Sequence, residues 1–183
     1  MGLSVQVRAE NVGTFRFIHV FLMEALARWV PNTHEMEVKV LFGRHVWDLA
    51  QQADALGKRT YELRAPLQFS LRPIERYAKF LEEFAITAPT PQKIAGFYDV
   101  VLPGLAARYQ RYLASTDRLL DEPTVRVMER ILDEFTRMQS DCRALLDELP
   151  LLRLNDREWT ARLTELEAAD CDIVAHRAAA AVA

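Results

Sequence analysis

The chain has 183 residues, half of them hydrophobic, and a formal net charge of −3 at pH 7. This length suits one domain with a full hydrophobic core. Its 23 Lys and Arg residues are outnumbered by 26 Asp and Glu residues, so no excess of positive charge is present to neutralise a phosphate backbone. We therefore expect one soluble domain that does not bind nucleic acid.

The cysteines and the apolar segments favour a cytoplasmic protein. Cys142 and Cys171 are the only cysteines, and they lie far apart in helical contexts, which is typical of reduced thiols. Residues 1–13 lack the apolar core of a signal peptide. Residues 17–30 form an apolar run, but polar side chains interrupt it, and it is shorter than the roughly 20 residues that a membrane span needs. We expect no membrane partner.

The predicted elements begin with an extended arm over residues 1–13. A first helix is expected over about residues 14–29, and it is apolar on nearly all sides, as buried helices are. A second helix is expected over residues 32–64, because Asn32 and Glu35 have the spacing of a capping box.

The second helix carries polar side chains on its apolar face. His45 and Gln52 fall on that face, and Asp48 lies one turn from His45 at its edge. A helical bundle keeps its ligand or metal sites at inward polar positions of this kind. The apolar face itself recurs at three- and four-residue steps and consists of Val38, Leu41, Phe42, Leu49 and Leu56.

A long crossover and three further helices follow. The crossover contains a short helix over about residues 73–84. A third long helix is expected over residues 91–115, and Pro103 inside it removes a backbone hydrogen bond, which predicts a bend near residues 99–102. The last two helices are expected over residues 122–149 and 156–180.

This layout predicts a single domain, residues 1–183, of the all-α class. Its core is a four-helix bundle over residues 14–150, with the long crossover between the second and third helices. Such a crossover lets the second pair of helices run antiparallel to the first. An extra C-terminal helix lies in residues 151–183.

Two strings of sequence carry a resemblance to a known family. The run E-x-K-V-L-F-G-R-H-V-W-D-L-A-Q-Q-A-D-A-L-G-K-R occupies residues 37–59, and D-E-P-T-V-R-V-M-E-R-I-L-D-E-F occupies residues 121–135. Over residues 14–150 the chain resembles small bacterial members of the ferritin-like superfamily. The resemblance implies a ferritin-like four-helix bundle.

The ligands of a ferritin-like di-iron centre are missing from the sequence. Such centres take one Glu from each of two helices and a Glu-x-x-His pair from each of the other two. None of the four histidines has a Glu three residues before it, and Glu134 is followed at that spacing by Arg137, which cannot bind a metal. We expect no standard di-iron centre and no cofactor.

His45 and Asp48 form the strongest candidate for catalysis. An Asp one turn away can orient an imidazole and raise its pKa, which would make His45 a general base or acid. The alternatives are a core histidine satisfied by a neighbour on its helix and a remnant of a lost metal site. Glu24 is the third catalytic candidate, because it matches the helix-A Glu of the family in rough position; the alternative is a surface pair with Arg28.

The remaining candidates are polar or aromatic side chains on inward faces. Glu134 and Arg137 are expected to pair, either structurally or around an anionic group of a substrate. Gln52 needs a hydrogen-bond partner if it is buried. Together with His19 and Phe42, these residues make up the predicted substrate-binding set. Other aromatic residues that either line a cavity or belong to the ordinary core are Trp47, Phe97 and Tyr98.

Three functions are consistent with these patterns. The first is a bundle that lacks the di-iron ligands and keeps the cavity, acting on a small organic molecule by metal-free acid–base or shape-based catalysis, as an accessory biosynthetic enzyme. The second is an iron- or manganese-dependent oxidoreductase with an atypical site made of Glu24, Glu37, His45, Asp48 and Glu134. The third is a non-catalytic protein that dimerises or binds a partner through the C-terminal helix. A homodimer is expected in any case, from the apolar stripes of the first and last helices.

Overall fold

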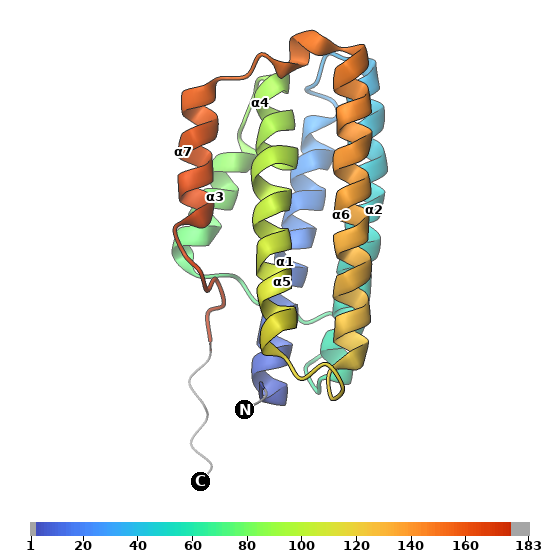
Figure 1. Cartoon of the computed structure of the whole chain (residues 1–183), viewed down its shortest axis with the longest axis vertical. Helices are drawn as coiled ribbons and strands as arrows, with labels where there is room; N and C mark the ends of the chain where they lie inside the picture. The colour runs from blue at the N-terminus through green and yellow to red at the C-terminus, as the bar shows by residue number, and fades with distance from the viewer. Residues whose placement is uncertain (1–2, 177–183) are drawn as a thin grey trace.

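The computed structural model describes residues 3–176, in which helices are the only regular secondary structure and no β-strand occurs (Figure 1). The all-α class is therefore confirmed. In chain order the elements are α1 (Val5–Trp29), α2 (Met36–Glu62), α3 (Glu75–Ala85), α4 (Thr90–Ile94), the π-helix η1 (Ala95–Val101), α5 (Leu102–Ser115), α6 (Glu122–Glu148), the 3-10 helix η2 (Pro150–Arg153) and α7 (Arg157–Ala168). No helix of the described residues is both long and apolar enough to cross a membrane.

Four long helical segments lie side by side (Figure 1). The chain runs up α1 and down α2, and the crossover with α3 carries it back to the upper end. It then runs down through α4, η1 and α5, which form one continuous rod, and up α6. As a result α2 and α6 are antiparallel neighbours, and this pairing positions the site described below.

The first helix begins earlier than the sequence indicated. Residues 5–13 belong to α1, so the predicted extended arm is wrong. The Ser4 hydroxyl caps the helix by accepting a hydrogen bond from the Val7 amide at 3.2 Å. Val12 is fully buried, so this added part of α1 packs into the core from about residue 8 onward. A Cβ at Gly13 would approach Phe69 to 2.7 Å, which shows how closely the crossover lies against α1.

The predicted capping box at the start of α2 is also wrong. The helix begins at Met36 without a side-chain cap. Glu35 instead accepts a hydrogen bond from the Thr90 hydroxyl at 2.9 Å. The buried Lys93 donates to the backbone carbonyl of Asn32 at 3.0 Å. These residues therefore tie the α1–α2 turn to α4 rather than capping a helix.

Pro103 produces a π-helix where a bend was expected. The Leu102 amide donates to the Phe97 carbonyl, five residues back, which is the π-helical pattern. The next amide in that pattern would serve the Tyr98 carbonyl, but it belongs to Pro103, which has no N–H. The Gln139 side chain donates to this carbonyl instead, at 3.0 Å. A side chain of α6 thereby holds the turn that carries Tyr98.

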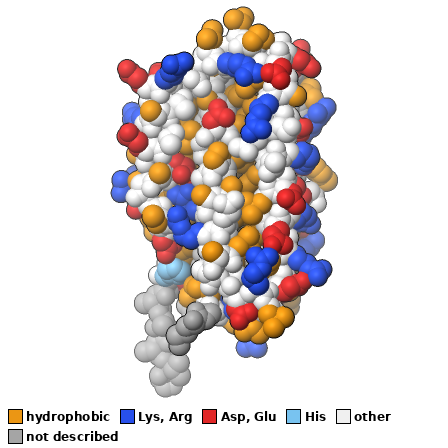
Figure 2. Space-filling model, viewed as in Figure 1, with side chains coloured by type: hydrophobic (Ala, Val, Ile, Leu, Met, Phe, Trp, Pro, Cys, Tyr) orange, Lys and Arg blue, Asp and Glu red, His pale blue; other side chains and the backbone are white. Residues whose placement is uncertain are grey.

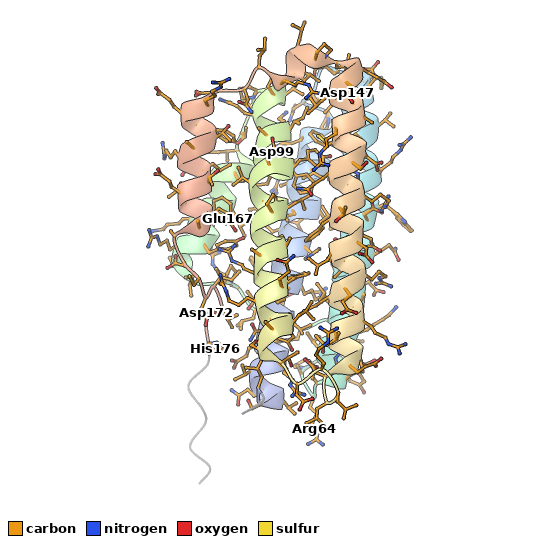
Figure 3. The ribbon with its side chains drawn as sticks, in the orientation of Figure 1. Arg64, Asp99, Asp147, Glu167, Asp172 and His176 are labelled. Carbon is orange, nitrogen blue, oxygen red and sulfur yellow. The ribbon has the colours of Figure 1, made fainter. Side chains whose placement is uncertain are left out.

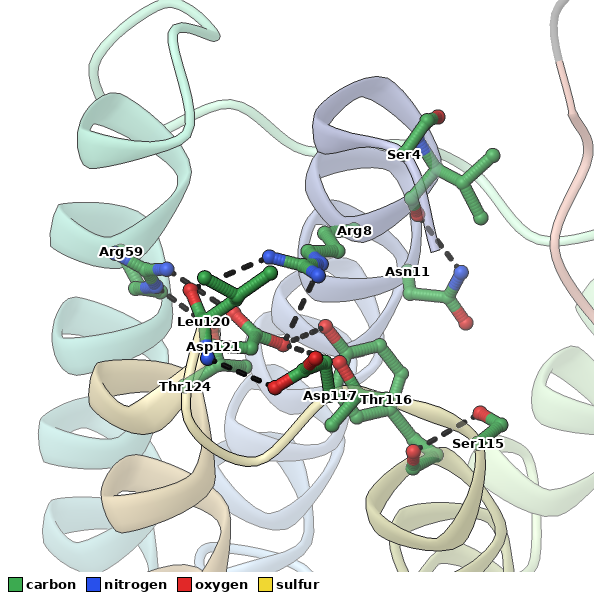
Figure 4. Close-up of polar contacts among 12 residues, drawn as sticks. Ser4, Arg8, Asn11, Arg59, Ser115, Thr116, Asp117, Leu120, Asp121 and Thr124 are labelled. Atoms are coloured by element: carbon green, nitrogen blue, oxygen red, sulfur yellow. Dashed lines mark hydrogen bonds and ion pairs between the residues drawn. The ribbon is translucent and has the colours of Figure 1, made fainter. Parts of the chain in front are cut away.

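One end of the bundle is fastened by a buried carboxylate, Asp121 (Figure 4). Its oxygens accept hydrogen bonds from side chains of α2, α5 and α6 and lie 4.0 Å from Arg8 of α1. Burial alone would raise the pKa of Asp121, but the hydrogen bonds together lower it below its ordinary value. The donors are Arg59, Tyr112, Thr116 and Thr124.

The C-terminal helix α7 packs on its own chain, against α3 and η1. Glu167 points from α7 towards α5, where it pairs with the buried Arg108 (Figure 3). A Cβ at Gly104 would overlap the Glu167 carboxylate, so glycine permits this close approach. The helix ends at Ala168, well short of the expected Ala180, and residues 177–183 lie outside the described residues.

Candidate functional site: the polar seam between α2 and α6

Polar side chains face one another at three levels between α2 and α6. On each helix they follow the same spacing of three and then four residues, so they share one face. Because the helices are antiparallel, the first residue on α2 meets the last on α6. We call this set the α2–α6 seam; its three pairs are His45 with Asp141, Asp48 with Arg137, and Gln52 with Glu134.

His45 is fully buried and is held through one ring nitrogen. Its Nδ1 lies 2.7 Å from the Tyr98 hydroxyl, and its Nε2 lies 3.6 Å from a carboxylate oxygen of Asp141. The Nε2 atom has no hydrogen-bond partner among residues 3–176. Because Nε2 faces a carboxylate, the tautomer with its proton on Nε2 is favoured, and the Tyr98 hydroxyl then donates to Nδ1.

The surroundings of His45 keep its ring neutral at pH 7. Burial lowers the pKa of His45 from its ordinary value, and the positive charge of Arg137 lowers it further. The carboxylates of Asp48 and Asp141 act in the opposite direction without overcoming the burial. A neutral imidazole with one nitrogen held and the other without a partner can exchange a proton with a neighbouring group.

The sequence suggested that Asp48 orients His45, but no hydrogen bond joins the two side chains in the structure. The Oδ1 atom of Asp48 pairs with Arg137 at 3.0 Å, whereas its Oδ2 is buried and lacks a hydrogen-bond partner in the described part of the chain. The predicted pair of Glu134 with Arg137 is therefore wrong. Arg137 reaches across to α2 and also lies 4.0 Å from Asp141.

Gln52 and Glu134 form the third pair of the seam. The Gln52 amide donates to Glu134 at 2.7 Å, and Arg130 lies 3.7 Å from the same carboxylate. Gln52 also lies close enough to His19 to raise its pKa in part, although its Oε1 makes no hydrogen bond of ordinary geometry. The Gln52 amide thus lies between His19 in the interior of the bundle and the partly exposed carboxylate of Glu134.

His19 belongs to the core of the bundle. Its Nε2 lies 2.6 Å from the Tyr109 hydroxyl, and its ring stacks on Phe135 with centroids 5.8 Å apart. Burial lowers the pKa of His19 to about 3. His19 is therefore neutral at physiological pH, and it packs as an aromatic side chain that satisfies a buried tyrosine.

Other predicted site residues lie away from the seam. Glu24 is exposed on α1, so it does not point into the bundle, and no surface pair with Arg28 forms within residues 3–176. Phe42 is buried against Trp29, with ring centroids 5.7 Å apart, which makes it part of the core. Trp47 is 66% exposed and lines no interior cavity.

Sequence reasoning missed Asp141 and Tyr109, and it named Tyr98 only as a bulky residue. Asp141 lies four residues after Arg137 and seven after Glu134, so helical spacing alone could have found it on the same face. Nothing local in the sequence marks either tyrosine as the partner of a histidine, because each pair joins residues far apart in the chain.

The seam opens to solvent through a depression at each end. The upper one lies where α2 begins and α6 ends, and Asp141 forms part of its wall. The lower one is lined by Asp48, Glu134 and Trp47, among others. A small molecule at the surface can thus reach Asp141, Asp48 and Glu134, whereas His45 and Gln52 are buried behind them.

The side chains present do not fit the proposed metal centres. Glu24 and Glu37 are exposed, and Asp48 pairs with Arg137, so the atypical set is not assembled around His45. No group of three or more His, Cys, Asp or Glu side chains within residues 3–176 is placed to hold a metal ion. At the middle level of the seam the guanidinium of Arg137 pairs with Asp48 and cannot bind a metal ion.

Comparison with known proteins adds no identification. No protein-family model matches the chain, and neither a curated protein nor a solved structure matches it. The ferritin-like resemblance therefore stays a prediction.

Proposed function

We propose that the α2–α6 seam is the site of an enzyme that acts on a small organic molecule by proton transfer, with His45 as the group that holds or moves the proton. One observation carries the proposal. His45 is buried and neutral, Tyr98 holds its Nδ1, and its Nε2 lies 3.6 Å from Asp141, which forms part of the wall of a surface depression.

The arrangement supports proton transfer along a short path. A ligand in the upper depression contacts Asp141, and Asp141 lies between it and His45. The ring takes up a proton at Nε2 from its other neutral tautomer, in which Nδ1–H donates to the Tyr98 oxygen, and the imidazolium that forms keeps its contacts with both Tyr98 and Asp141 without reorientation. Asp48 and Asp141 stabilise the imidazolium that forms, and the burial of His45 returns it to the neutral form.

We infer a ferritin-like bundle as the scaffold. The order of the four long segments, with one long crossover between the second and third, supports that connectivity. The proposed chemistry does not depend on this scaffold, because it rests on His45 and its neighbours. We also propose a cytoplasmic location, which the two free cysteines support.

A screen of small polar fragments by NMR tests the proposal. Fragments that bind should shift the amide signals of residues around Asp141, and Asp141→Asn should weaken their binding while the protein stays folded. His45→Gln should change the pH dependence of binding. The matched control is His34→Gln, which alters an exposed histidine outside the seam. Binding that is the same in all four proteins would contradict the proposal.

Self-association through α2 is a second candidate function. Met36, Val40 and Trp47 lie on one face of α2 and are 65%, 49% and 66% exposed. Gly43 lies between them with open space beside it, so a second helix can approach closely. The C-terminal helix is less suited to this role, because Leu163 already packs within its own chain. Sedimentation of the wild type and of Trp47→Glu tests the candidate: a dimer that Trp47→Glu dissociates supports it.

A further inference from the structure

Large apolar side chains form a stripe along the solvent-facing side of α2. The helix packs mainly between α1 and α6, and its third side carries Met36, Val40 and Trp47, which are 65%, 49% and 66% exposed. The other large hydrophobic side chains that are exposed within residues 3–176 lie in loops, in the 3-10 helix or at helix ends: Val5, Tyr61, Leu67, Ile86, Leu119, Leu120, Leu151 and Leu154.

The stripe includes a glycine and is limited to the first half of α2. Met36, Val40, Gly43 and Trp47 are separated by four, three and four residues, so they share one face of the helix, and we call them the α2 stripe. Gly43 has open space beside it, which leaves room for a side chain of another helix. Beyond Trp47 the same face carries a charged pair of α2 instead of apolar side chains.

The α2 stripe is self-complementary under a two-fold rotation. When two copies of a helix cross antiparallel, each residue of one copy lies opposite the residue of the other copy at the same distance beyond the axis. In the chain, the midpoint of Met36 and Trp47 coincides with the midpoint of Val40 and Gly43. One axis at this midpoint sets Trp47 of one copy on Met36 of the other. The same axis directs Val40 into the space beside Gly43.

Two charged side chains beside the stripe fit the same axis. Glu37 and Arg44 are exposed and line the flank of α2 that faces α6, and the ion pairs of α2 within residues 3–176 involve other residues. Their midpoint is one residue from that of the stripe, about 1.5 Å along the helix. A two-fold rotation keeps this flank on the same side of the contact in both copies. Arg44 of one copy therefore reaches Glu37 of the other, twice in each dimer.

We propose that α2 pairs with α2 of a second copy of the chain in an antiparallel, two-fold symmetric dimer, with Val40 near the axis and Glu37–Arg44 ion pairs on one flank. The inference rests on self-association, the second candidate function, and adds its symmetry, register and ion pairs. A parallel pairing fits the stripe less well. Gly43 would then meet Gly43 and Trp47 would meet Trp47, so that small faces small and large faces large.

Single cysteines along the stripe test the register in the full chain, with the exposed Cys171 replaced by serine. Disulfide-linked dimers are measured after mild oxidation. Val40→Cys and Gly43→Cys each lie about 4.5 Å along the helix from their symmetry mates, so both should link. Met36→Cys and Trp47→Cys each lie about 16.5 Å from theirs and should stay unlinked. A mixture of the Met36→Cys and Trp47→Cys proteins should link, because these two positions meet across the axis.

Charge exchange tests the ion pairs. Arg44→Glu and Glu37→Arg should each weaken the dimer about tenfold in sedimentation experiments, because each dimer contains the pair twice. The double variant Glu37→Arg/Arg44→Glu should restore the affinity of the wild type, since it exchanges the two charges. Lys79→Glu reverses an exposed charge on α3, away from the stripe, and as the matched control it should have no effect.

The outcomes separate this arrangement from self-association itself. A dimer that Trp47→Glu dissociates, but that links in Met36→Cys alone or is not restored by the charge exchange, would overturn the antiparallel pairing and leave self-association through α2 in place. A chain that stays monomeric, or a dimer that Trp47→Glu leaves intact, would overturn both. The proposal for His45 is tested independently by the fragment screen.

Discussion

Arg137 on α6 pairs with Asp48 on α2 at 3.0 Å, in the level of the seam next to His45. The sequence predicted that Asp48 would orient His45 and that Arg137 would pair with Glu134. In the structure Asp48 and Arg137 pair with each other. The position of this pair also affects the histidine, because the guanidinium lowers the pKa of His45 while the carboxylates raise it.

Arg137→Ala should raise the pKa of His45. The variant removes the positive charge that opposes protonation and leaves the Asp48 and Asp141 carboxylates in place. The loss of stability should be at most about 1 kcal/mol, because Arg137 is half exposed and solvent screens the pair. A histidine NMR titration and urea unfolding measure both effects. Arg126→Ala, which breaks an exposed pair with Glu122, is the control and should leave the pKa of His45 unchanged.

His19 should make the protein less stable as the pH falls. Its pKa is about 3 in the folded protein and has an ordinary value of 6.5, so between these values the unfolded chain binds more protons. The contribution of neutral His19 to the free energy of unfolding is fully present above pH 6.5. It declines below that pH by about 1.4 kcal/mol per pH unit.

In His19→Phe this part of the slope should be lost between pH 4 and 6, whatever the effect of the variant on stability at pH 7. Urea unfolding at several pH values measures it. His34→Gln should keep the slope of the wild type, because His34 is exposed. An unchanged slope in His19→Phe would show that His19 is not held neutral by burial.

Tyr98→Phe should remove the hydrogen bond to Nδ1 of His45 while the proton stays on Nε2, which faces Asp141. The variant removes the hydroxyl 2.7 Å from Nδ1 and leaves that nitrogen buried without a partner. A stability loss of about 1–3 kcal/mol is expected from the unsatisfied group. Nitrogen-15 NMR of the imidazole reports the tautomer. Tyr109→Phe is the matched control: it removes the equivalent hydroxyl at His19 and should leave the signals of His45 in place.

Gln139→Ala should cost about 1 kcal/mol in the wild type and less in a Pro103→Ala background. Gln139 satisfies the Tyr98 carbonyl because Pro103 lacks an amide hydrogen. Alanine at position 103 supplies that hydrogen, so the side chain is no longer needed. A double-mutant cycle from urea unfolding measures the coupling. Independent, additive effects would contradict this explanation of the π-helix.

The sequence predicted the helices better than their ends. The expected fourth helix over residues 122–149 corresponds closely to α6, and the short crossover helix to α3. Their apolar periodicity is a local signal that survives folding. The start of α1 is predicted too late because the sequence before Thr14 shows no clear apolar stripe, although Ser4 caps the helix and residues 8–10 are buried.

The partners of the site could not be read from local spacing. The sequence names His45, Gln52, Glu134 and Arg137 as candidates from helical spacing, and the structure places all four along the facing sides of α2 and α6. Which of them meet depends on the register between α2 and α6, and a shift of one turn exchanges every partner. The contact of His45 with Tyr98 depends in addition on the π-helix, which shifts the face on which Tyr98 lies.

The exposed apolar side chains at the two ends of the bundle were not expected. Leu119 and Leu120 lie in the loop before α6, and Leu151 and Leu154 lie at or just after η2. Between these ends, Figure 2 shows charged side chains of both signs interspersed over the face that carries α5 and α6. No periodic signal marks loop leucines as exposed, since hydropathy alone assigns them to the core.

The most direct test of the central claim is a pH titration of His45 by nitrogen-15 NMR, in the wild type and in Asp141→Asn. We predict a neutral ring at pH 7 with its proton on Nε2 and a pKa below the ordinary 6.5, which falls further in Asp141→Asn because that carboxylate favours protonation. A His45 that is charged at pH 7, or whose titration does not respond to Asp141→Asn, would contradict the claim that this histidine moves a proton through the seam.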